Sequence, residues 1–249
     1  MRPRRANCWR RFLISILFFV ESYTSSAIVA PRAQHSASRH TLVAMDPQTE
    51  NEMRRAQEMH QFVADQLAGK YPSDDRRAIL ASFLSLAQSH HEAIIVLCFH
   101  ERLIGSAYAL IRPLVEVVCR GLFAGFLATP EQIEKIKQGE EPYGKFNELV
   151  AKLDDKFDTE GLFIRYGGKG WKTLNGLTHG GLEQLNRRVG ENGEIGCHFE
   201  QEDVQLLLSS STSVFAQIAW QFLGAMDRQD ACHAVIAKYV ALYSEPQER

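Results

Sequence analysis

Apolar residues recur three and four positions apart along most of the chain, which is the period of an amphipathic helix. One long run of this kind begins near Ser73, and two more cover residues 201–226 and 229–243. No stretch shows the sustained two-residue alternation of a half-buried strand. The pattern therefore predicts an all-α fold, a single bundle of seven or eight helices.

Capping residues mark several of the expected helix boundaries. Asp46 and Pro47 are the expected start of a first helix, and Gly69 its stop. Ser73 is the expected N-cap of the second helix, and Thr129 begins a later one together with the proline after it. Further helices are expected at residues 106–128, at 145–157 and in a short segment that ends at the glycines 180–181.

The domain is expected to span residues 45–249, with residues 1–44 as an N-terminal extension outside the fold. The extension holds seven arginines and one acid, and its apolar stretch from Phe12 to Val20 is too short to span a bilayer. That layout is typical of a secretory signal peptide, and the protein would then be exported. An alternative is that translation starts at Met45, which places the protein in the cytoplasm; an anchor or other tail is a third.

The net charge of the domain and the spacing of its cysteines limit the classes of function that we expect. Residues 45–249 contain 21 basic and 29 acidic side chains, so this domain is expected to repel nucleic acid at long range. Cys98 and Cys119 lie in apolar helical runs, where a thiol acts as a small hydrophobe. The five cysteines show no CxxC spacing or disulfide framework, which indicates a reducing compartment.

Residues 106–128 form the most apolar stretch of the domain, and its only charges are Arg112, Glu116 and Arg120. Their spacing places them with Tyr108 on one side of a helix, and the two arginines can pair with the glutamate between them. Pro113 is expected to bend this helix, as are the two glycines further along it. Three interpretations stay open: a solvent-facing stripe, a structural internal ladder, or a ligand-binding or catalytic groove.

His179 lies in the sequence NGLTHGG, at the expected end of a short helix. The glycine after it can take the positive φ of a helix C-cap, so a structural role is the simplest interpretation. The functional alternative makes His179 a proton carrier or phosphate contact that faces Arg112 and Glu116.

Established motifs for metal or nucleophile chemistry are not found. Pairs such as His90-His91 and Cys197-His198 lack metal-ligand spacing, so we expect neither a metal site nor a cofactor. The SSSTS run at 209–213 is expected inside a helix, where small hydroxyl side chains allow close packing.

The segments ALIRPLVEVVCRG and WKTLNGLTHGG resemble a family of bacterial helical proteins of unknown function, which is distantly similar to the HEPN superfamily of helical bundles. The resemblance covers about residues 48–243 and implies a HEPN-like bundle. Many HEPN proteins are ribonucleases that use an arginine followed four to six residues later by a histidine. Arg228 and His233 have that spacing, as do Arg54 or Arg55 with His60, which is about as many matches as chance gives in this composition.

Together these features favour a binding or interaction module that self-associates as a homodimer, with Tyr108 and Arg120 as further ligand contacts. The enzyme alternative is metal-independent RNA cleavage by His179 with Arg112 and Glu116, or by the pair Arg228 and His233. RNA is an expected partner only under that alternative.

Overall fold

The computed structural model describes residues 45–69, 74–99, 103–159, 161, 163, 168–190 and 193–243. These residues are helical apart from connecting turns and one isolated antiparallel bridge between Val189 and Ile195, so the all-α prediction is confirmed. Eight of their helices have eight residues or more: α2 (Pro47–Leu67), α3 (Asp75–Cys98), α5 (Ile111–Phe126), α6 (Pro130–Lys137), α7 (Phe146–Phe157), α8 (Gly168–Thr178), α10 (Gln201–Ala225) and α11 (Gln229–Tyr243). Two short ones, α4 (Ile104–Ala109) and α9 (Leu182–Leu185), lie between them.

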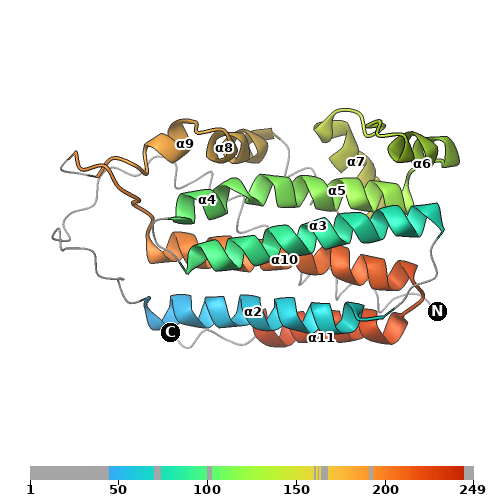
Figure 1. Ribbon diagram of the computed structural model, residues 1–249, viewed down its shortest axis with the longest axis horizontal. Coiled ribbons are helices and arrows are strands. Elements are labelled where there is room, and N and C mark those ends of the chain that lie inside the picture. Colours follow the sequence, from blue (N-terminus) through green and yellow to red (C-terminus); the bar gives the residue numbers. More distant parts are fainter. Residues whose placement is uncertain are drawn as a thin grey trace.

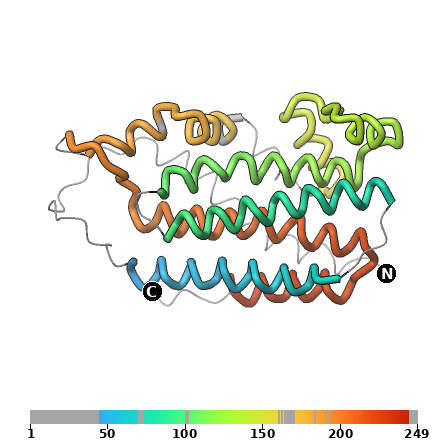
Figure 2. The backbone as a smooth tube through the Cα atoms, viewed as in Figure 1, coloured from blue at the N-terminus to red at the C-terminus, as the bar shows by residue number. Residues whose placement is uncertain are grey.

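The helices are stacked in layers along the long axis of the molecule. Figure 1 shows α2 and α11 side by side at one face, α3 and α10 above them, and α4 and α5 above those. Helices α6 to α9 form the opposite face and lie over α4 and α5 (Figures 1 and 2). None of the helices in the described part of the chain is long and apolar enough to cross a membrane.

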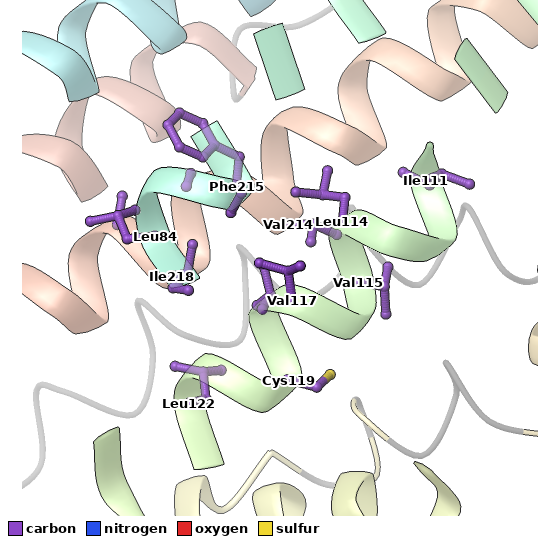
Figure 3. Close-up of a cluster of buried hydrophobic side chains, with 14 of the residues drawn as sticks. Leu84, Ile111, Leu114, Val115, Val117, Cys119, Leu122, Val214, Phe215 and Ile218 are labelled. Atoms are coloured by element: carbon purple, nitrogen blue, oxygen red, sulfur yellow. The ribbon is translucent and has the colours of Figure 1, made fainter. Parts of the chain in front are cut away.

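Helix α10 is the centre of the bundle because it packs against α2, α3, α5 and α11. Its residues from Ser210 to Leu223 are all buried, so its hydroxyl side chains pack inside the protein as the sequence predicted. Ser211 and Thr212 satisfy their hydroxyls by donating to the carbonyl of Leu208. Figure 3 shows how side chains of α10 meet those of α3 and α5 in an apolar core.

Most of the expected helix starts are observed. Asp46 accepts a hydrogen bond from the backbone N–H of Thr49 at 2.6 Å, and Thr129 forms a reciprocal capping box with Gln132. The N-cap of α3 was expected at Ser73 and is one residue later. It is Asp74, whose side chain accepts a hydrogen bond from the N–H of Arg77. A carboxylate at this position also interacts favourably with the positive end of the helix dipole.

The helix expected at residues 106–128 is divided at Leu110 into α4 and α5. Pro113 is the third residue of α5, so it lies in the first turn instead of bending the middle of a longer helix. A proline is tolerated there, but it has no N–H to donate to the carbonyl four residues earlier. The hydroxyl of Thr178 in α8 lies 3.3 Å from this carbonyl of Ala109 and 2.9 Å from the carbonyl of Leu174 in its own helix, so its one proton is shared between the two acceptors.

The glycines of α5 allow neighbouring helices to approach closely. A Cβ atom at Gly121 would lie 2.8 Å from the Cβ of Phe83 and 2.9 Å from Cδ1 of Ile218. One at Gly125 would lie 2.9 Å from Cδ2 of Leu80. These contacts, with α3 and α10, explain the glycines without any bend in the helix.

Candidate functional site

Arg112, Glu116 and Arg120 form a ladder of ion pairs along α5. Both Nε and Nη2 of Arg112 contact Oε1 of Glu116, at 3.0 and 2.9 Å, and Nη2 of Arg120 lies 3.8 Å from Oε2. The exposed fractions of the three side chains are 21%, 21% and 33%. The ladder is therefore half-buried, so it is neither the fully solvent-facing stripe nor the fully internal ladder that were considered. Its charges pair with one another as predicted.

The structure brings His179 to the first residue of this ladder. Helix α8 ends at Thr178, and Gly180 follows with a φ of 68°, the left-handed conformation expected after a helix end. Thr178 contacts the break between α4 and α5 through the Ala109 carbonyl, while its hydroxyl also contacts the carbonyl of Leu174 in α8. The exposed His179 side chain then lies with Nε2 2.5 Å from Nη1 of Arg112. Arg112, Glu116 and His179 thus converge; below they are called the Arg112 cluster.

The contact between Arg112 and His179 fixes which imidazole nitrogen carries the proton. A guanidinium group is always a donor and has no acceptor atom. Nε2 of His179 must therefore accept from Arg112 with its lone pair, and the proton of the neutral ring is on Nδ1. His179 consequently presents a donor to solvent and uses its acceptor internally.

Trp171 completes the cluster and was missed by the sequence analysis. The Cζ atom of Arg112 lies 4.8 Å from the centroid of its ring, a cation–π contact. The same ring stacks on Phe146 of α7, with centroids 3.8 Å apart and planes 13° from parallel. An arginine fixed by a carboxylate and an aromatic ring loses little conformational freedom when it binds a ligand. The signal available in the sequence was spacing, since Trp171 lies on α8 eight residues before His179, the residue that follows the helix.

Arg120, expected to contact a ligand, lies at the other end of the ladder. Its Nη1 donates to Oε1 of Glu141 at 3.3 Å, and its guanidinium lies over the ring of Tyr143. Burial raises the pKa of the Tyr143 hydroxyl. The ladder therefore joins α8 at its Arg112 end to the connection between α6 and α7 at its Arg120 end.

Tyr108, the other expected ligand contact, is not brought to the Arg112 cluster. It is fully buried on α4, where its hydroxyl donates to the carbonyl of Asp203 at 2.6 Å and its ring stacks on Phe199. The carboxylate of Asp203 forms an ion pair with Arg187. These contacts tie α4 and the loop before α10 to the start of α10.

Arg228 and His233, the alternative pair, lie just before α11 and within it. Arg228 donates from Nη1 to the carbonyl of Gln66 at 2.8 Å, which ties the start of α11 to the end of α2. The side chain of His233 is exposed on α11. Arg55 pairs with Glu52, Arg54 pairs with Glu58, and His60 contacts His91.

Within the described ranges, no three histidine, cysteine or acidic side chains are placed to hold a metal ion. Four of the cysteines, Cys98, Cys119, Cys197 and Cys232, are free thiols, and Cys8 lies outside the described residues. Burial raises the pKa of Cys98 to about 12 and raises that of Cys119 as well. These two thiols are thus protonated and act as core side chains.

Comparison with known proteins places most of the domain in one family. A family of unknown function, DUF6988, matches residues 84–246, which include the whole Arg112 cluster but not α2. Neither a curated protein nor a solved structure matches the chain.

The tautomer of His179 gives a direct test of this geometry. We expect long-range ¹H–¹⁵N NMR at mildly alkaline pH to show Nδ1 protonated and Nε2 bare. In Arg112→Gln the ring should shift toward the Nε2-protonated form that free histidine prefers, because the donor facing Nε2 is weaker and uncharged. The exposed His233 is the internal control, and it should be the same in both proteins. A protonated Nε2 at His179 in the native protein would contradict the arrangement.

Proposed function

This chain belongs to DUF6988, a family of unknown function, and we propose that it is a binding protein whose Arg112 cluster takes an anionic group. The observation that carries the proposal is the contact between Arg112 and His179. It places the guanidinium of half-buried Arg112 next to the N–H-bearing imidazole of exposed His179. Hydrogen bonds from charged donors to oxyanions are among the stronger polar contacts in proteins.

A count of donors supports an oxyanion as the ligand. Arginine has five N–H bonds, and the contacts of Arg112 with Glu116 and His179 use three of them. The other two have no partner among the described residues, nor has the Nδ1–H of His179. A phosphate or carboxylate group could accept from both side chains at once. Glu116 balances the charge of Arg112, so the site favours a short polar anion over a large polyanion.

The same contact disfavours RNA cleavage, the alternative function. A general base needs a lone pair that faces the proton it removes. The Nε2 lone pair of His179 is directed at Arg112, and Nδ1 carries the proton. The domain also has eight more acidic than basic side chains, which disfavours binding of a nucleic-acid backbone. The free thiols are consistent with a cytoplasmic location, which stays part of the proposal.

The proposal predicts that inorganic phosphate binds at the Arg112 cluster. In a titration followed by the ring signals of His179, phosphate should shift these signals saturably. Arg112→Gln should weaken binding by tenfold or more, because a charged donor to the anion is lost, equivalent to about 1.4 kcal/mol. His233→Asn, at an exposed histidine on α11, is the matched control and should bind as the native protein does.

Equal phosphate binding by Arg112→Gln and the native protein would contradict the proposal. Acetate in place of phosphate separates a carboxylate from a tetrahedral oxyanion as the preferred group. RNA cleavage in the presence of EDTA that is lost in His179→Ala would instead favour the nuclease alternative. RNA cleavage that is lost only in His233→Ala would assign the nuclease activity to His233 on α11.

Self-association is a second part of the proposal, supported by exposed apolar side chains near one end of the bundle. They belong to α9 and the loop after it and to the segment before α4: Leu182, Leu185, Val189, Ile195, Phe99 and Leu103. Exposed apolar side chains commonly mark protein interfaces where they form a contiguous surface, and the partner we propose is a second copy of the chain. Light scattering over a dilution series should show a dimer that Leu182→Glu and Ile195→Glu convert to monomer. A monomer at every concentration would exclude it.

A further inference from the structure

A hydrogen-bonded chain of two histidines and a threonine links α2, α3 and α10, and it shares no residue with the Arg112 cluster. Nδ1 of His60 on α2 lies 3.1 Å from Nδ1 of His91 on α3. Nε2 of His91 lies 3.1 Å from the hydroxyl oxygen of Thr212 on α10. Both imidazole rings stack on Phe215 of α10, and His91 is fully buried.

The protons of this chain can be assigned from its inner end. Thr212 donates its hydroxyl proton to the carbonyl of Leu208 at 2.7 Å, so its oxygen is the acceptor for His91. His91 therefore carries its proton on Nε2 and presents a lone pair at Nδ1. His60 must then donate from Nδ1, which leaves the Nε2 lone pair of His60 to take up a further proton.

This arrangement limits the pair to one added proton. Protonation of His60 at Nε2 keeps the bond between the two Nδ1 atoms. Protonation of His91 at Nδ1 does not, because two N–H groups would then face each other 3.1 Å apart. A second proton can enter only if His60, and with it α2, moves away from α3.

We propose that the His60–His91 pair is an acid-sensitive latch, whose protonation releases α2 from α3 and α10 while the rest of the bundle stays folded.

Burial supports the direction of the effect. It lowers the pKa of His91 well below the ordinary value of 6.5 and also lowers that of His60, against a smaller opposing effect of Glu92. Both pKa values return toward 6.5 when α2 is released. The open form therefore binds more protons as the pH falls below 6.5, and the closed form is fully stabilised only above it. The opening constant should rise up to about tenfold per pH unit for each proton taken up.

The other charged groups between α2 and its neighbours either act at lower pH than the histidines or oppose them. The hydrogen bond from Lys238 of α11 lowers the pKa of Glu58 from its ordinary value of 4.5, so this pair favours opening only in stronger acid. Burial raises the pKa of Glu52 on α2, with a smaller opposing effect of Arg55. Glu52 therefore binds its proton more readily in the closed form and opposes opening in acid. Removing its charge should leave the effect of the histidines intact or larger.

Helix α2 is suited to local release because its buried face is partly polar. Two of its six buried residues are Thr49 and Glu52, whereas all ten buried residues of α5 are apolar or glycine. Segments that bury less apolar surface open at a lower free energy than the core.

Hydrogen–deuterium exchange of the full chain at about pH 7.5 and about pH 5.5 tests the latch. After correction for intrinsic exchange rates, amides of α2 should lose protection tenfold or more at the lower pH, while those of α5 keep theirs. His60→Gln should abolish this selective loss, and Glu52→Gln should not. His90→Gln is the matched control, since burial also lowers the pKa of His90 but no described hydrogen bond joins it to α2.

Loss of protection in α2 and α5 at the same pH would overturn the latch, and so would α2 protection that does not depend on pH. Both outcomes are read from the native protein, so the test stands even if a variant fails to fold. An unchanged pH response of α2 in His60→Gln would overturn it as well.

Discussion

The missing N–H of Pro113 is the constraint on which the candidate site depends. It leaves the carbonyl of Ala109 without its helical partner at the junction of α4 and α5, and the hydroxyl of Thr178 shares its proton between that carbonyl and the carbonyl of Leu174 in its own helix. A fully buried carbonyl without a hydrogen bond would cost about 1–3 kcal/mol and this half-buried one less, so the contact contributes to where α8 ends. The next residue along the chain is His179, and the docked helix end places its ring against Arg112.

Two sets of polar contacts, the ladder of α5 and the pair of His60 and His91, therefore lie on either side of one apolar core. The centre of the bundle is α10, where the buried hydroxyls of Ser211 and Thr212 donate to a carbonyl of the same helix and Thr212 also contacts His91. On one side of it, α5 carries the half-buried ladder that leads to the Arg112 cluster. On the other, the pair of His60 and His91 links α2 to the core. In each set, the hydrogen-bond donors and acceptors can be assigned. The assignment at the Arg112 cluster supports the proposed anion binding, and the assignment at His60 and His91 supports the proposed response to acid.

The sequence predicts the parts of this architecture that local patterns control. Helical periodicity gives the all-α bundle, and the caps at Asp46 and Thr129 follow from side chains within three residues of the helix start. The spacing of Arg112 and Glu116 likewise predicts their ion pair. Contacts between distant segments have no such local signal. The bond from Thr178 to Ala109 spans 69 positions, and the partner of His91 on α10 lies 121 positions away. Tyr108 shares the helical phase of the ladder, yet its ring is buried among residues that precede and begin α10.

The central claim is that Thr178, whose hydroxyl proton is shared with the carbonyl of Leu174, holds α8 in place by also contacting the carbonyl that Pro113 leaves open. A double-mutant cycle between Pro113→Ala and Thr178→Val, measured as the free energy of unfolding in urea, tests it most directly. An alanine at 113 restores an N–H for the Ala109 carbonyl, so the hydroxyl of Thr178 should then matter less. We expect a coupling of about 1 kcal/mol between the two substitutions, with Thr178→Val more costly when Pro113 is present. Costs that simply add, within about 0.3–0.5 kcal/mol, would contradict the account.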